Sequence, residues 1–262
     1  MLKKKTSDPT NEEQQTAQLV NERLEALLLS RELPSALHEA ITYSIFPNGK
    51  RFRSKFAIFL ARDLGLSDDQ ILEAACSVEL IHCASLIHDD LPALDNDEMR
   101  RGKPSCHIAF SEATAILAGD TMISLALELA AHHKGDKGRE YTVYLPRAFT
   151  DLCAGQKLDL SPEQEREVLE IHRLKTGALL LLLPQWLQLG LACPQLDVKS
   201  SDSLVKHWAS CFKLLTTIWI STDLKKNAAD REAVISGIKK KLFSLIWVKS
   251  THIKSLRKLK KN

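Results

Sequence analysis

Apolar residues recur at spacings of three and four along almost the whole chain, and this helical period constrains the fold more than any other feature. Glycine and proline, which interrupt helices, number only ten and nine among 262 residues. The sequence therefore predicts an all-α protein, a single helical bundle. Helices are expected over residues 12–30, 34–46, 55–64, 67–91, 112–131, 141–158, 162–193 with a bend near Pro184, and 202–217.

Export and membrane insertion are not indicated. The charged start MLKKKTSDPTNEEQQ lacks the apolar stretch of a signal peptide. The most apolar run, residues 178–191, is short for a bilayer and contains Pro184 and Gln185, so it is typical of a buried helix. The six cysteines form no C-x-x-C pair, which favours a reducing compartment. We expect a cytoplasmic protein with no transmembrane segment.

The charge is unevenly distributed. Residues 224–262 contain twelve Lys and Arg against two Asp and Glu, whereas residues 1–223 contain twenty-four against thirty-one. A basic segment can bind nucleic acid or an anionic membrane, or it can be a solvated end of the chain. The solvated end is the favoured interpretation, and no nucleic-acid partner is predicted.

The stretch SLIHDDLPALDNDEMRRGKPSCH, residues 85–107, is the most informative in the chain. It gathers five carboxylates and then three cations: Asp89, Asp90, Asp95, Asp97, Glu98, Arg100, Arg101 and Lys103. Such carboxylates repel one another unless cations bind them. Oxygen ligands of this kind suit magnesium, which phosphate oxygens typically complete, and paired arginines present planar forks to the same phosphates. The alternatives are an acidic loop with ordinary surface ion pairs, or a zinc site using His88, Cys106 and His107, for which the spacing lacks a ligand set.

The spacing of the aspartates also predicts a local structure. Asp95 follows Asp89 by six residues, about 600° in a straight helix, which turns the two side chains some 120° apart. The helix must therefore bulge or end between them. Pro92 is the obvious cause, because its ring clashes with the carbonyl of His88.

Several segments in this order resemble the trans-isoprenyl diphosphate synthases. D-D-x-x-x-x-D followed by R-R-G-K-P is similar to the first aspartate-rich motif of that family, and FPNGKRFRSKF (46–56) is similar to its G-G-K-R-x-R-P segment, with Asn48 and Ser54 replacing Gly and Pro. AGDTMISLALE, GQKLDL and HRLKTGALL resemble later helices. The likeness covers about residues 35–193. It implies an isoprenoid-synthase-like bundle around a central apolar cavity, and a homodimer.

The resemblance implies two diphosphate sites. The diphosphate of isopentenyl diphosphate would be held by Lys50, Arg53, His82 and Arg101. Two magnesium ions bridging the allylic diphosphate would be bound by Asp89 and Asp95, with Asp90 in support.

The remaining implied roles concern catalysis and product length. Arg100 and Lys175 would grip the allylic diphosphate, while Thr176 and Gln156 would line the reacting carbons. Ala84 and Ser85 lie one turn before the aspartates, so they would form the floor of the cavity and influence chain length. Asp120 lies in an apolar helical run and either accepts a hydrogen bond at a bend or faces the site.

The C-terminal part departs from the family. A second aspartate-rich motif is expected near residues 216–224, where Asp223 is the sole carboxylate, so the third magnesium site is predicted to be lost. The loss coincides with the rise in basic charge, which divides the chain into a synthase domain (1–212) and a divergent basic segment (213–262). A frameshift and true divergence both account for this change.

The leading functional hypothesis is a magnesium-dependent prenyltransferase that makes farnesyl diphosphate from isopentenyl diphosphate and an allylic diphosphate. Geranylgeranyl diphosphate is the close alternative product, because Ala84 and Ser85 are small. A second hypothesis is a catalytically impaired homologue or subunit. A terpene cyclase is disfavoured, because it needs no second diphosphate site.

Overall fold

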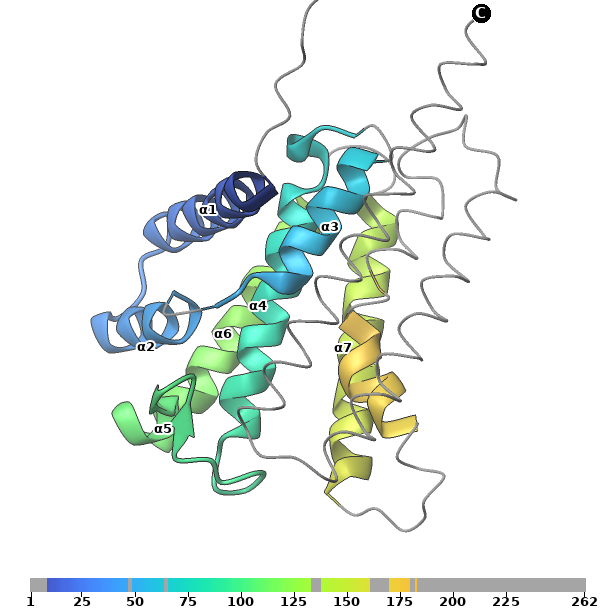
Figure 1. Ribbon diagram of the computed structural model, residues 1–262. Helices are drawn as coiled ribbons and strands as arrows, with labels where there is room; N and C mark the ends of the chain where they lie inside the picture. Colours follow the sequence, from blue (N-terminus) through green and yellow to red (C-terminus); the bar gives the residue numbers. More distant parts are fainter. Residues whose placement is uncertain are drawn as a thin grey trace, which may run out of the picture. The chain divides into compact units, whose positions relative to one another are not determined.

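A computed structural model gives the fold of the chain (Figure 1), and it describes residues 9–46, 49–63, 66–132, 138–160, 170–179 and 182. The chain divides into two compact units, Met1–Gln195 and Leu196–Asn262, and all described residues lie in the first. The predicted bend near Pro184, the helix over 202–217, the boundary after residue 212 and the altered second motif lie outside the described residues.

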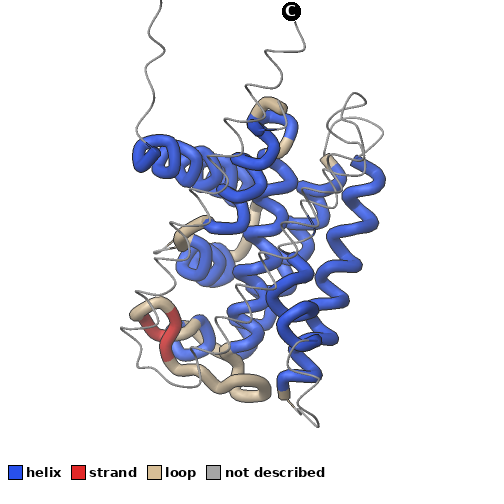
Figure 2. Tube along the Cα trace, turned by 45° about the vertical axis from the view of Figure 1, so that its right-hand side comes forward, coloured by secondary structure: helices blue, strands red, loops and turns tan. Residues whose placement is uncertain are grey.

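The prediction of an all-α fold is confirmed. Within the described residues, the long helices are α1 (Pro9–Leu29), α2 (Ser35–Ile45), α3 (Phe52–Asp63), α4 (Leu72–Asp89), α6 (Glu112–Ala131) and α7 (Gly138–Asp159). Short elements are the 3-10 turn η1 (Asp68–Gln70), α5 (Cys106–Ala109) and the π-helical turn η2 (His172–Gly177). The strands β1 (Met99–Arg100) and β2 (Lys103–Pro104) form a small antiparallel hairpin that the helical pattern did not predict, drawn in red in Figure 2.

The core is centred on α4, which lies beside α6 and also contacts α2, α3 and α1 (Figure 1). A helix that is apolar on most of its circumference belongs in the interior of a bundle. Buried along α4 are Ala74, Ala75, Cys76, Val78, Leu80, Ile81, Cys83, Ala84 and Ile87. Small side chains let α6 approach closely, and a Cβ on Gly119 would lie 2.1 Å from Nε2 of His88.

Among the described helices, α6 is long and apolar enough to cross a membrane by length and composition. The same test is passed by buried helices of a bundle, and α6 has this character. It packs against α4, α2 and α7, and Ala115, Met122 and Leu129 are buried. We therefore interpret α6 as a core helix.

The C-terminal end of α7 contacts η2, a π-helical turn inside the helix that was predicted over 162–193 with a bend near Pro184. Gly155 makes this contact possible, because a Cβ there would lie 2.5 Å from the backbone nitrogen of Lys175. π-helical turns often occur at functional sites, where the extra residue redirects side chains. Here the turn contains Lys175 and Thr176.

Candidate active site

The aspartate-rich segment begins where α4 ends. Asp89 is the last residue of α4, Asp90 is its C-cap, and Pro92 follows in a turn. The amide N–H of Asp95 donates to the carbonyl oxygen of Asp89 at 2.8 Å, so the loop folds back on the helix end. The prediction that the helix must bulge or end between Asp89 and Asp95 is confirmed, and the structure shows that it ends.

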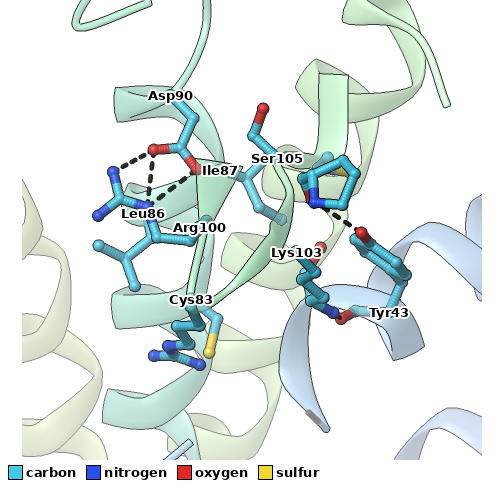
Figure 3. A pocket seen from close by; sticks show the side chains of 12 residues that line it. Tyr43, Cys83, Leu86, Ile87, Asp90, Arg100, Lys103 and Ser105 are labelled. Atoms are coloured by element: carbon cyan, nitrogen blue, oxygen red, sulfur yellow. Dashed lines mark hydrogen bonds and ion pairs between the residues drawn. The ribbon is translucent and has the colours of Figure 1, made fainter. Parts of the chain in front are cut away.

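Asp90 pairs with Arg100 of the hairpin, as the dashed lines in Figure 3 show. Nε of Arg100 donates to Oδ1 and Oδ2 of Asp90 at 2.8 and 3.1 Å, and its Nη2 donates to Asp97 at 2.9 Å. Burial raises the pKa of Asp90, while the hydrogen bond from Arg100 opposes that rise. Arg100 thus favours the charged form of this carboxylate, against the larger effect of burial.

Asp89 and Asp95 form a second pair, facing Gln156 and Lys175. Burial raises the pKa of Asp89 to about 6; the charge of Lys175 opposes this and that of Asp95 adds to it. Nε2 of Gln156 donates to Asp95 at 3.2 Å, whereas its buried Oε1 has no hydrogen-bond partner in the described part of the chain. Nζ of Lys175 lies 2.6 Å from Asp159 and 3.9 Å from Asp95. Thr176 follows in η2, but its side chain is outside the described set.

A basic cluster lies earlier along α4. Burial lowers the pKa of His82 well below its ordinary value, and the charges of Arg53 and Arg101 lower it further. Nε of Arg53 is buried and has no hydrogen-bond partner within the described residues. Unpaired buried donors on a cation are costly unless an anion completes them.

The segment before α3 and the hairpin approach this cluster. Arg101 reaches that segment, since a Cβ on Gly49 would lie 3.3 Å from its Nη1. Lys50 is exposed and lies two residues before α3, which contains Arg53. Of the predicted residues, Arg53, His82 and Arg101 are thus close together, whereas the contact of Lys50 with them stays a prediction.

The hairpin that presents Arg100 and Arg101 is tied to α2. Figure 3 shows Tyr43 and Lys103 at this junction. The hydroxyl of Tyr43 donates to the carbonyl oxygen of Pro104 at 2.7 Å, and Lys103 donates to the carbonyl oxygen of Tyr43 with Nζ 3.4 Å from the ring centroid. Sequence reasoning missed Tyr43, because its partners Lys103 and Pro104 lie 60 and 61 residues later in the chain.

Ala84 and Ser85 are buried in α4. The Ser85 hydroxyl donates to the carbonyl oxygen of His82 at 2.9 Å, within its own helix. Neither residue lines the pocket in Figure 3, which lies between α2, α4 and the hairpin. Their role in chain length stays a prediction. Asp120 of α6 is largely exposed, with Oδ1 3.8 Å from Nε2 of His88.

The described residues contain no group of three or more metal-ligating side chains close enough to hold an ion. Asp90 is engaged by Arg100, which leaves Asp89 and Asp95 as a pair of oxygen ligands. Magnesium commonly takes one or two protein carboxylates and completes its shell with water and phosphate oxygens. The pair fits magnesium that arrives together with a phosphate-bearing ligand.

A family model described as Polyprenyl synthetase matches residues 34–215. The chain belongs to the polyprenyl synthetase family. This polyprenyl synthetase is 37% identical over 216 residues to the farnesyl diphosphate synthase of Haemophilus influenzae, with 78% of this chain and 72% of that protein covered. It is 42% identical over 180 residues to the chloroplastic geranylgeranyl pyrophosphate synthase 7 of Arabidopsis thaliana, with 63% and 50% covered. It therefore spans about half the length of this plant relative.

Solved structures support the same fold. A geranyltransferase from Legionella pneumophila is similar with a TM-score of 0.75 and 32% identity, and 95% of each chain is covered. A geranyltranstransferase from Thermotoga maritima has a TM-score of 0.69 and 27% identity, with 93% of this chain and 98% of that chain covered. The chain accordingly has the fold of an isoprenoid-synthase-like helical bundle.

Proposed function

We propose that this polyprenyl synthetase is a prenyltransferase that joins isopentenyl diphosphate to dimethylallyl or geranyl diphosphate and yields farnesyl diphosphate. The observation that carries the proposal is the pair of charged clusters along one end of α4. Asp89 and Asp95 face Lys175, and a separate basic cluster surrounds Arg53. Two such clusters match two diphosphate substrates, whereas a cyclase needs one.

The reaction breaks the C1–O bond of the allylic diphosphate, and the double bond of isopentenyl diphosphate attacks the resulting cation before a proton is lost to the released diphosphate. Arg100 and Lys175 would stabilise the negative charge that develops on the leaving group. Thr176 and Gln156 would lie beside the reacting carbons, and the apolar interior of the bundle would exclude water from the cation. Lys50, Arg53, His82 and Arg101 would hold the second diphosphate.

Asp89 and Asp95, with Asp90 beside them, would hold magnesium in this proposal. Bound magnesium supplies positive charge to the leaving diphosphate. Arg100 must then share Asp90 with the ligand or release it, because the guanidinium already contacts both carboxylate oxygens.

Product length is the finer part of the proposal. Relatives at similar identity include both a farnesyl and a geranylgeranyl diphosphate synthase. Farnesyl diphosphate is proposed first, with geranylgeranyl diphosphate as the alternative supported by the small side chains of Ala84 and Ser85. Ala84→Phe should shorten the products detected by mass spectrometry. An unchanged distribution of product lengths would show that Ala84 does not line the substrate pocket.

A homodimer is also proposed, in the cytoplasm. On α6, Ile116, Leu117 and Leu127 are 44%, 57% and 37% exposed although they are large and apolar. Ile116 and Leu127 are separated by about 20° around the helix, and Leu117 lies about 100° from Ile116, so the three side chains share one half of the helix surface and offer apolar area to a second copy. Leu117→Lys should shift the protein toward monomer in analytical ultracentrifugation, and an unaltered mass would reject this surface.

A second candidate is an impaired homologue that binds substrates without turning them over. It is supported by the presence of Asp223 as the sole carboxylate over residues 216–224, and by the family match ending at residue 215. The deciding experiment incubates the purified chain with magnesium, isopentenyl diphosphate and geranyl diphosphate and measures C15 and C20 products. Product formation lost in the presence of a chelator supports the synthase. Binding of both substrates without product supports the impaired homologue, and no binding rejects both.

A further inference from the structure

In the sequence, Arg51 lies between Lys50 and Arg53, which are both proposed to bind isopentenyl diphosphate. Its own side chain is instead buried in the protein. The residue is 2% exposed. Its Nε donates to Oδ1 of Asn21 in α1 at 2.7 Å, and its Nη2 donates to the carbonyl oxygen of Ile45 at the end of α2 at 2.6 Å. The guanidinium therefore joins the segment before α3 to two earlier helices.

The charge of Arg51 is balanced by Glu79 of α4. Nη1 of Arg51 lies 3.2 Å from Oε1 of Glu79, and the two side chains are 1% and 3% exposed. The other carboxylate oxygen accepts from the hydroxyl of Ser54 at 3.3 Å. Each nitrogen of the Arg51 guanidinium thus has a protein partner, so this cation contacts the protein interior and does not contact a ligand.

The backbone of Arg51 is unusual as well. Its φ of 47° lies in the left-handed region, which is strained for a non-glycine residue and persists where surrounding contacts hold it. The carbonyl oxygen of Arg51 accepts from the amide of Lys55 at 2.9 Å, in the first turn of α3. A Cβ on Gly49 would lie 2.7 Å from Nη1 of Arg51, so the backbone on the other side is also packed against the guanidinium.

On either side of Arg51, the side chains of Lys50 and Arg53 lie in different environments. Lys50 precedes Arg51 and is exposed, whereas Arg53 follows it and places an unpaired Nε in the basic cluster with His82. The carboxylate of Glu79 acts on both arginines, because its charge also raises the pKa of Arg53 against the effect of burial. The buried Arg51–Glu79 pair therefore holds the turn before α3, and the carboxylate of Glu79 partly offsets the positive charge of Arg53.

We propose that Arg51 is a positioning residue for isopentenyl diphosphate: its guanidinium, bonded to Asn21, Ile45 and Glu79, holds the turn over residues 49–53 so that Lys50 and Arg53 meet the same diphosphate. This inference rests on the proposed function. It differs from a direct ligand role because each nitrogen of the Arg51 guanidinium donates to a protein partner and the residue is 2% exposed.

The test compares the affinities of two ligands in Arg51→Lys, which keeps the charge but cannot make three directional contacts at once. Isothermal titration calorimetry measures Kd for isopentenyl diphosphate and, with magnesium, for unreactive geranyl thiolodiphosphate. We expect the first Kd to rise about tenfold and the second to change less than twofold. Circular dichroism confirms that the variant is folded.

Arg23→Lys is the matched control. Arg23 and Glu73 form a second Arg–Glu pair between α1 and α4, at 2.9 Å, but with side chains 27% and 26% exposed. We expect this variant to bind both ligands like the wild type. A general loosening of the contact between α1 and α4 would instead affect both variants alike and overturn the proposal.

The double variant Arg51→Gln with Glu79→Gln distinguishes a positioning role from a purely electrostatic role, because the net charge of the pair is unchanged. A positioning role predicts that binding of isopentenyl diphosphate stays weakened in the double variant. Full recovery of its affinity, or a Kd unchanged in Arg51→Lys, would show that Arg51 acts through charge alone or not at all.

If Arg51→Lys does not fold, Asn21→Ala takes its place, because it removes one of the three contacts and leaves the buried charges paired. A selective two- to threefold weakening of isopentenyl diphosphate is then expected, and an equal effect on both ligands contradicts the proposal. Wild-type chain that binds no isopentenyl diphosphate overturns the proposed function as well. Binding that is lost in Arg53→Ala but unaffected in Arg51→Lys and Asn21→Ala overturns this inference alone.

Discussion

Carboxylates and cations alternate around the end of α4, whereas the region around Arg53 and His82 carries an excess of positive charge. In the first region Asp90 pairs with Arg100, and Asp159 pairs with Lys175. In the second, Arg53 keeps an unpaired buried Nε and His82 is held neutral. The comparison teaches that the acidic region holds more carboxylates than its two cations neutralise, while the basic region keeps an unpaired donor that can bind an anion. We therefore expect metal dependence in the acidic region and direct anion binding in the basic one.

The largest expected effect is on the acidic side. Asp89→Ala removes one of the two carboxylates that face each other beside Lys175, so magnesium-dependent binding of geranyl thiolodiphosphate should weaken about 100-fold, a loss of roughly 3 kcal/mol. Calorimetry with and without magnesium measures this loss. Asp97→Ala serves as the comparison, because its exposed carboxylate contacts Arg100 but not the Asp89 pair. Magnesium dependence that survives in Asp89→Ala would contradict the metal assignment.

The next effect concerns the basic side. Arg53→Ala should weaken isopentenyl diphosphate by roughly 1.5–3 kcal/mol, since a charged hydrogen bond to phosphate is lost, and should leave the allylic analogue nearly unchanged. Titrating both ligands into the same preparation measures the difference. Equal loss of the two affinities would abolish the division between the regions.

The pH dependence of stability tests the burial of Asp89 in the acidic region. Burial raises the pKa of Asp89 to about 6 from its ordinary 3.8, so the folded chain holds this proton more tightly than the unfolded chain. The contribution of Asp89 to the free energy of unfolding is therefore most favourable below the pKa of the unfolded chain, and it is lost as the pH rises through the folded-state pKa of about 6. Asp89→Asn should therefore become more stable than wild type by on the order of 2 kcal/mol between pH 4 and 7. Urea unfolding without magnesium tests this, and a constant difference across that range would refute it.

The smallest effect tests the element shared by both regions. Tyr43→Phe removes the hydrogen bond to Pro104 that ties the hairpin to α2, while retaining the ring beneath Lys103. Because the hairpin presents Arg100 and Arg101, both ligands should bind about fivefold more weakly, about 1 kcal/mol. Phe110 packs edge-on against the Tyr43 ring, so Phe110→Leu reports on loss of packing alone. A selective effect of Tyr43→Phe on one ligand would show that the two arginines are held independently.

The sequence was sufficient where local geometry decides the structure. The six-residue spacing from Asp89 to Asp95 and the ring of Pro92 required a helix end, and the chain ends α4 there. It was insufficient where distant elements decide. Arg51 stands between Lys50 and Arg53 in a basic run and has no local sign of burial; its environment comes from Asn21 and Glu79, which are 30 and 28 residues away. The π-helical turn at Lys175 likewise depends on Gly155 of another helix.

That glycine has a consequence for laboratory evolution of the enzyme. Any β-carbon at position 155 would collide with the backbone at Lys175 and with Leu174, where no rotamer change relieves the contact. Cys153, two positions earlier on the same helix, is exposed. A saturation library over this stretch of α7 should therefore accept many residues at position 153 and retain glycine at 155, so variation intended to reshape the substrate cavity is better directed elsewhere.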